Sequence, residues 1–161
     1  MFAGKKVVLG ISGGIAAYKA ADVVSWLTKN HAEVHVVMTK HATEFITPLV
    51  MQTLSGRPVA VDEFATGFGW QVVHISLVER ADLVAVIPAT ANVLAKIAHG
   101  IADDVLTSAI LAATCPILLA PAMNVHMYEN VATQTNLARL QEMGYELLEP
   151  ASGRFACGTE G

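Results

Sequence analysis

Short blocks of β-branched and other apolar residues alternate along the chain with longer, alanine-rich segments, and this alternation constrains the fold most. The blocks over 5–12, 33–38, 82–88 and 116–121 are apolar with little polar interruption, which is typical of strands buried on both faces. The segments between them carry apolar residues at helical spacing, as in 15–28. Strands that alternate with helices predict a parallel sheet. We therefore expect an open, doubly wound, Rossmann-like α/β sheet of about six parallel strands with helices on both faces.

Weaker patterns complete the expected order of elements. A weak third strand is expected over 58–61 and a last strand over 145–148, while the glycines in 63–73 predict a loop. Four further segments are predicted to be helical, namely 41–51, 91–98, 104–113 and 133–143. Because the sequence contains no internal repeat, low-complexity tract or linker, we expect one domain over 1–161.

Apolar residues make up 53% of the 161 residues and charged residues only 15%, whereas ordinary globular domains carry about 25% charged residues. This composition excludes a disordered chain, which requires low hydrophobicity and high net charge. Polar or charged residues interrupt every apolar run before it reaches the ~18 residues of a spanning helix, so we expect no membrane segment. The apolar excess instead favours burial of surface between copies of the chain in a homo-oligomer.

Charge and cysteine content exclude further classes of protein. The formal charge is −4 and no cluster of lysine and arginine is present, so the electrostatic footprint of a nucleic-acid-binding protein is missing. Cys115 and Cys157 are too few for a disulfide framework and lack the spacing of a zinc site. We expect no metal, reduced thiols and a cytoplasmic location.

In sheets of this kind the ligand binds beyond the carboxyl ends of the strands. The first such segment contains Ser12, Gly13, Gly14 and Ile15, and a glycine-rich turn before a helix presents backbone N–H groups that suit a phosphate. It matches neither the dinucleotide nor the P-loop pattern, and Thr39-Lys40 replaces an acidic residue after the second strand. The pattern favours a mononucleotide, with glycines that merely permit a tight turn as the alternative.

Two further segments follow predicted strands. In 88–92, small residues and a hydroxyl group permit close approach of a flat ligand, although Thr90 is equally suited to cap a helix. In 120–128, Asn124 stands where the chain leaves the sheet and is either a turn former or a recognition amide. The methionines of this segment are typical of packing.

Two single residues are candidates for proton chemistry. His74 lies among apolar residues, where it is either a satisfied core histidine or a catalytic base. Cys157 lies in a small, polar segment next to Arg154 and is a better candidate for a reactive thiol than Cys115, which precedes an apolar block.

Taken together, these features resemble the homo-oligomeric flavin-containing cysteine decarboxylases, most closely those that act on phosphopantothenoylcysteine in coenzyme A biosynthesis. The resemblance covers essentially the whole chain, in order. Pro121-Ala122-Met123-Asn124-Val125-His126-Met127 resembles the PxMNxxM substrate signature, and Arg154-Phe155-Ala156-Cys157-Gly158 resembles the reactive-cysteine flap. Tyr128 replaces the tryptophan that usually completes the signature. The signature and the flap are the specific part of the resemblance.

The resemblance implies a redox-neutral decarboxylation of 4′-phosphopantothenoylcysteine to 4′-phosphopantetheine with FMN as the cofactor. It implies that His74 is the base or electrostatic partner of the oxidation step, that Asn124 orients the carboxylate and that Cys157 donates a proton. Substrate is implied to contact Asn124, Met127 and the flap of about 151–161, through Arg154, Phe155 and Ala156. The residues implied to bind FMN are Ser12, Gly13, Gly14, Ile15, Thr39, Lys40, Pro88, Thr90, Ala91, Asn92 and Ala122.

The resemblance also implies partners and leaves alternatives. Members of the family form trimers that assemble into dodecamers, and in many bacteria the decarboxylase is fused to a phosphopantothenate–cysteine ligase, so we expect these 161 residues to be part of a longer protein. The alternatives are a peptidyl-cysteine decarboxylase, a flavin prenyltransferase of the same fold, and a non-catalytic FMN-binding regulatory subunit.

Overall fold

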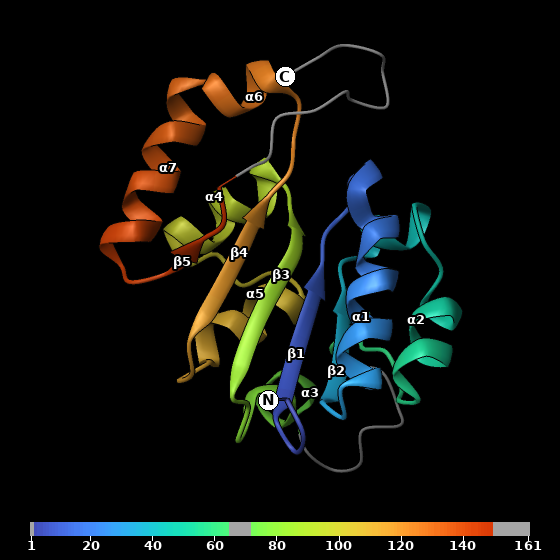
Figure 1. Ribbon diagram of the computed structural model, residues 1–161. Helices are drawn as coiled ribbons and strands as arrows, with labels where there is room; N and C mark the ends of the chain where they lie inside the picture. The colour runs from blue at the N-terminus through green and yellow to red at the C-terminus, as the bar shows by residue number, and fades with distance from the viewer. Residues whose placement is uncertain (1, 65–71, 150–161) are drawn as a thin grey trace.

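The computed structural model describes residues 2–64 and 72–149, which form a five-stranded parallel sheet with the order β2-β1-β3-β4-β5 (Figure 1). The order reverses between β1 and β3, so the carboxyl ends of these two strands form the switch point at which ligands bind in such sheets. This confirms the predicted doubly wound α/β fold. The strands are β1 (Lys6–Ile11), β2 (Glu33–Met38), β3 (Leu83–Ala89), β4 (Ile117–Pro121) and β5 (Glu146–Leu147).

The prediction of about six strands is wrong by one, because the segment 58–61 does not form a strand. Only Ala60 pairs with the sheet, through an isolated bridge to Val37 at the edge strand β2. Its N–H donates to the carbonyl of Val36 at 3.0 Å, and its carbonyl accepts from the N–H of Met38 at 2.8 Å. Pro58 has no N–H to donate, so the segment cannot pair there as a regular strand does.

Helices cover the two faces of the sheet and enclose two apolar clusters. The helices α1 (Ala20–Lys29) and α2 (Pro48–Ser55) pack on one face, where Leu9, Val24 and Met51 are fully buried. The opposite face is covered by α3 (Val73–Val78), α4 (Ala91–His99), α5 (Val105–Ala112) and α7 (Val131–Glu142). The predicted arrangement of helices on both faces is thus confirmed. No helix of the described residues is long and apolar enough to cross a membrane.

The helices differ from the expectations at several places. The segment predicted as a helix over 15–28 begins with the 3₁₀ helix η1 (Ile15–Lys19) before α1. The helix predicted over 41–51 is split into the 3₁₀ helix η2 (Lys40–Glu44) and α2, because proline is compatible with the first helical turn but not with a helix interior. Most of the predicted loop over 63–73 lies outside the described residues, and its last residue, Val73, begins α3. Neither α3 nor the short helix α6 (Val125–Glu129) was predicted.

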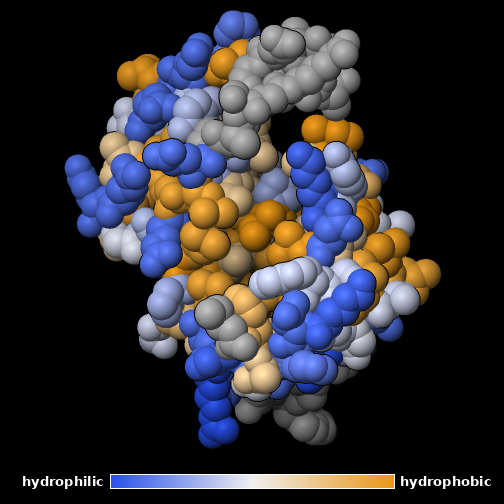
Figure 2. All heavy atoms as spheres, viewed as in Figure 1, coloured by the Kyte–Doolittle hydropathy of each residue, from blue (hydrophilic) through white to orange (hydrophobic). Residues whose placement is uncertain are grey.

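One part of the sheet keeps an incompletely covered apolar face. Leu83 and Ile87 of β3 and Leu118 of β4 face the side of α1 and are only partly buried. Figure 2 shows hydrophobic side chains gathered over β3 and β4, between α1 and α7. Since parallel sheets are normally covered on both faces, this surface has the character of a contact surface.

Candidate active site

The predicted phosphate segment, residues 12–15 (the glycine loop), is joined to residues 88–92 (the Thr90 turn) by the side chain of Ser12. The Ser12 hydroxyl group donates to the carbonyl of Pro88 at 2.7 Å and accepts from the N–H of Thr90 at 2.9 Å. The side chain is completely buried. Ser12 therefore ties together two segments that follow β1 and β3, at the predicted switch point.

The glycine loop also packs against residues 39–42 (the Thr39 turn), which follow β2. A Cβ atom on Gly13 would lie 2.5 Å from the Cβ atom of His41 and 2.8 Å from its carbonyl carbon, so only glycine fits this position without displacement. A Cβ atom on Gly14 would meet only Thr90 Cγ2, at 3.4 Å. The absence of a side chain at Gly13 thus lets the glycine loop pack directly against the Thr39 turn.

Hydroxyl groups in these segments cap the helices that follow. Thr39 Oγ1 accepts from the N–H of Ala42 at 3.2 Å, and Thr90 Oγ1 accepts from the N–H of Val93 at 3.4 Å. The helix-capping alternative for Thr90 is therefore confirmed. Residues that remain exposed at this edge, where they can meet a ligand, include Ile15, Lys40 and Asn92.

The segment with the predicted substrate signature, residues 121–128 (the Asn124 segment), continues from the end of β4 beside the Thr90 turn. The N–H of Ala122 donates to the carbonyl of Ala89 at 3.0 Å. Asn124 caps α6 with its Oδ1 atom, which accepts from the N–H of His126 at 2.9 Å. This bond confirms the turn-forming alternative, and it leaves the two donors of the amide NH₂ group out of the cap. Met127 is 49% exposed.

His74 lies apart from these segments, on the side of the sheet opposite α1. It is the second residue of α3, which packs on α5 near the amino-terminal end of the sheet (Figure 1). Lys6, the first residue of β1, fixes α3 there by donating from Nζ to the carbonyls of Ser76 and Glu79 at 3.1 and 2.8 Å. Within one chain, the structure therefore brings together the predicted cofactor residues and the Asn124 segment but not His74.

A carboxylate that was not predicted lies beside His74. Its Nδ1 atom lies 3.8 Å from Oε1 of Glu63, and that oxygen accepts a hydrogen bond from Ser108 of α5 at 2.5 Å. Nδ1 itself is buried and has no hydrogen-bond partner among the described residues. Ser108 lies 45 residues from Glu63 in the chain, so no local pattern could have identified this group.

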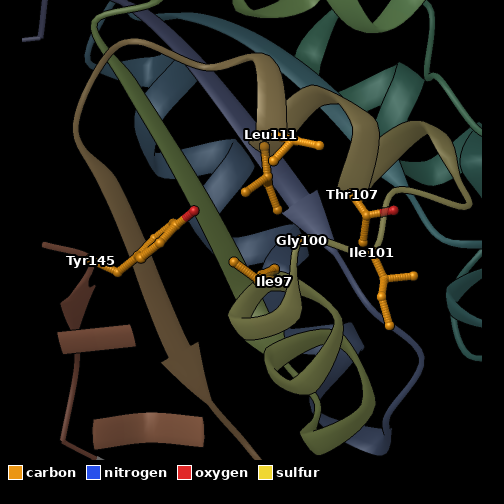
Figure 3. Close-up of a pocket in the computed structure, with 7 residues that line it drawn as sticks. Ile97, Gly100, Ile101, Thr107, Leu111 and Tyr145 are labelled. Carbon is orange, nitrogen blue, oxygen red and sulfur yellow. The ribbon is translucent and has the colours of Figure 1, made fainter. Parts of the chain in front are cut away.

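Two surface hollows lie away from the glycine loop. One is a small, apolar hollow between α4, α5 and Tyr145, lined by side chains such as Ile97 and Leu111 (Figure 3). The other lies between α7 and the β4–β5 edge and is lined by Pro121, Tyr128 and Leu137 among others. The second hollow is thus bounded in part by the Asn124 segment.

The predicted flap residues Arg154, Phe155, Ala156 and Cys157 lie outside the described residues. Cys115, the other cysteine, is partly buried against the apolar cluster that contains α4 and α5. This position agrees with the expectation that Cys115 is the poorer candidate for a reactive thiol.

A model of the family described as Flavoprotein matches residues 1–161. The chain therefore belongs to the flavoprotein family.

Two relatives within this family are similar to the chain over nearly its whole length. The chain is 52% identical to the coenzyme A biosynthesis bifunctional protein CoaBC of Vibrio vulnificus over 159 residues, which cover 99% of this chain and 40% of that protein. It is 46% identical to the probable phosphopantothenoylcysteine decarboxylase of Streptococcus mutans over 159 residues, covering 98% of this chain and 89% of that protein. The chain thus spans about 40% of the length of its bifunctional relatives.

Solved structures agree in fold. The FMN-dependent cysteine decarboxylase SpaF superposes with a TM-score of 0.89 at 36% identity, covering 100% of this chain and 91% of that chain. A cysteine-to-serine variant of a PPC decarboxylase complexed with pantothenoylaminoethenethiol superposes with a TM-score of 0.84 at 35% identity, covering 98% and 88%.

Proposed function

We propose that this domain catalyses the FMN-dependent decarboxylation of 4′-phosphopantothenoylcysteine to 4′-phosphopantetheine. The observation that carries the proposal is the junction at the switch point, where Ser12 joins the glycine loop to the Thr90 turn and the Asn124 segment follows on the next strand. The similarity to the decarboxylase of Streptococcus mutans, over most of both chains, supports the same substrate.

The residues present at the switch point fit FMN. Gly13 closes the glycine loop onto the Thr39 turn, and the first N–H groups after Gly14 lack partners within their own helix. Together with the exposed Lys40, they supply donors and positive charge for a phosphate. Ala91 and Ala122 leave room for a flat ring system. We assign the phosphate to the glycine loop and Lys40, and the ring to the Thr90 turn and Ala122.

The chemistry explains why a cysteine substrate needs a flavin. Direct loss of CO₂ from its carboxylate would leave a carbanion without an electron sink. Bound FMN supplies a two-electron oxidation of the carbon that carries sulfur and later returns the same two electrons. The resulting thioaldehyde accepts the electron pair released with CO₂, and the product is an enethiolate. Return of a hydride equivalent and two protons then gives the thiol. One of these protons replaces the thiol proton lost during oxidation, so the reaction consumes one proton overall.

We assign the proton and orientation roles to three residues. His74 accepts the thiol proton during oxidation. The NH₂ group of Asn124, which its helix cap does not use, donates to the substrate carboxylate. Cys157 supplies the proton that completes the product, with Arg154, Phe155 and Ala156 folding over the substrate to exclude water.

We further propose that the enzyme is a cytoplasmic homo-oligomer, either a trimer or a dodecamer assembled from trimers, in which each flavin lies between two copies. Two observations support this: His74 and the glycine loop lie at different ends of the sheet in one chain, and β3 and β4 present an incompletely covered apolar face. The bifunctional relatives support a ligase domain fused to this one in the full protein.

The decisive experiment is turnover of phosphopantothenoylcysteine by the purified, yellow protein, followed by CO₂ release and flavin absorbance. His74→Asn should abolish flavin reduction and CO₂ release together, whereas Cys157→Ser should release CO₂ and accumulate the enethiol. A colourless protein that takes up no FMN would refute the proposal. Turnover of a peptide ending in cysteine, of a prenyl donor, or of none of these would favour the respective alternative.

A further inference from the structure

We propose that Glu63 is a positioning residue for His74, which holds the imidazole ring with its neutral-state proton on Nδ1. The Nε2 atom is then the one that can accept a proton from the substrate. The inference rests on the proposed function for its meaning, since it concerns the base of that reaction, but its geometry is independent of the flavin.

The geometry begins with a carboxylate that is itself fixed. Ser108 donates to Oε1 of Glu63 at 2.5 Å, which anchors the carboxylate to α5. The same oxygen lies 3.8 Å from Nδ1 of His74. This distance is longer than a hydrogen bond, so a movement of less than about 1 Å would form one. Such bonds in catalytic sites are often long without substrate and tighten in the complex.

Burial shows which edge of the imidazole ring faces the carboxylate. The side chains of His74 and Glu63 are 27% and 29% exposed, yet Nδ1 is buried without a hydrogen-bond partner among residues 2–64 and 72–149. The exposed part of the His74 side chain therefore lies at atoms other than Nδ1. A buried ring nitrogen without a partner is costly, and Glu63 is the acceptor that the structure places beside it.

A carboxylate at Nδ1 would have two effects on a histidine base. It selects the tautomer with the proton on Nδ1, which leaves the lone pair on Nε2 for the substrate. It also stabilises the imidazolium ion that forms when Nε2 accepts a proton, as the aspartate does in serine-protease triads. Free imidazole side chains otherwise favour the proton on Nε2, which would leave the base facing inward.

The test compares Glu63→Ala and Glu63→Gln with a control, Glu79→Ala. The control removes the glutamate at the carboxyl end of α3, the helix that carries His74. The holoprotein with ¹⁵N-labelled histidine is studied by solid-state NMR, and the His74 signals are assigned by their loss in His74→Asn. We expect the Nδ1–H tautomer in the parent protein and in Glu79→Ala, and the Nε2–H tautomer in Glu63→Ala. Glu63→Gln keeps an acceptor oxygen and should retain the Nδ1–H tautomer.

Stopped-flow reduction of the bound flavin by phosphopantothenoylcysteine gives the second measurement. Loss of an outer residue that orients a reacting group costs about 10- to 100-fold, and we expect that loss in Glu63→Ala. Glu63→Gln should also be slower, because it lacks the charge that stabilises imidazolium. Melting temperature and FMN affinity should match those of Glu79→Ala. An unchanged tautomer in Glu63→Ala would overturn the proposal even if the rate fell.

The two proposals fail in different ways. If the parent protein does not reduce its flavin with this substrate, the proposed function is wrong, and the tautomer comparison still decides whether Glu63 orients His74. If the parent protein turns over and Glu63→Ala matches it in tautomer and rate, only the role of Glu63 is refuted.

Discussion

Replacing Ser12 by alanine removes the hydroxyl group that joins the glycine loop to the Thr90 turn. Two hydrogen bonds disappear, at 2.7 Å to the Pro88 carbonyl and at 2.9 Å from the Thr90 N–H. The Pro88 carbonyl keeps a weaker bond from the Ser12 N–H at 3.3 Å, whereas no comparable acceptor replaces Oγ for Thr90. Each unsatisfied group buried in this way costs about 1–3 kcal/mol, so we expect a loss of about 2–3 kcal/mol.

The measurement is urea unfolding of flavin-free protein, followed by circular dichroism at matched concentrations because assembly shifts apparent stability. For a domain of this size, the expected loss corresponds to a fall in Tm of about 5–10 °C. Ser55→Ala is the matched control. Ser55 is also buried, at 8% exposed, but among the described residues its hydroxyl group forms hydrogen bonds only with the backbone of Arg57, both at 3.3 Å. We expect its loss to stay below about 1 kcal/mol.

Ser12→Ala should also weaken FMN binding about tenfold, or 1.4 kcal/mol, because the two loops must then be ordered by the ligand itself. The Ser55→Ala control should bind FMN like the parent protein. If the two variants lose equal stability, or if Ser12→Ala binds FMN unchanged, then the bonds of Ser12 do not organise the switch point.

Two further predictions concern the packing of the glycine loop and the response to pH. Gly13→Ala should lose more stability and more FMN affinity than Gly14→Ala in the same unfolding and titration assays. The reason is that a Cβ atom at Gly13 would meet His41 at 2.5 Å, whereas one at Gly14 would meet Thr90 at 3.4 Å. Equal losses in the two variants would contradict the close packing of Gly13. Burial lowers the pKa of His35 on β2, although its hydrogen bond to Glu33 opposes this effect. The unfolded chain therefore binds more protons as the pH falls below about 6.5, and stability should decrease from pH 7 to pH 5. His35→Gln should flatten that slope in urea titrations, and an unchanged slope would contradict the assignment.

Much of the fold could be predicted because its strands are buried on both faces and read as unbroken apolar runs. The bounds of β2, 33–38, agree with the expectation, β3 is shifted by one residue at both ends, and α4 is one residue longer at its carboxyl end. The failures have local causes. The segment 58–61 contains a proline, which lacks an N–H donor, and pairs with the sheet through Ala60 alone. The helix α6 is only five residues long and is capped by Asn124. Neither feature produces a periodic pattern.

The segments of the candidate site could be predicted because each of them comes directly after a strand. The glycine loop, the Thr90 turn and the Asn124 segment meet because parallel strands end at one edge. The contacts that organise them were not predictable, since Ser12 and Pro88 are 76 residues apart. The same holds for Glu63, whose neighbours come from α3 and α5. Motifs therefore identified the kind of site, while tertiary structure identified its supporting residues.

The separation of His74 from the glycine loop leads to a test of the proposed shared site by mixing variants. Gly14→Asp places a carboxylate in the glycine loop, where it repels phosphate and meets only Thr90 at ordinary contact distance, while His74→Asn removes the base. Each homo-oligomer should be inactive. A His74→Asn chain keeps a normal glycine loop, and a Gly14→Asp chain keeps His74. If each site takes its glycine loop from one chain and its His74 from the neighbour, a mixed oligomer therefore contains some intact sites. Random mixing of equal amounts in a closed cyclic trimer gives about one such site in four, so refolded mixtures should regain about 25% of the parent activity. A mixture that forms mixed oligomers, shown by tagged co-purification, but stays inactive would place the complete site within one chain.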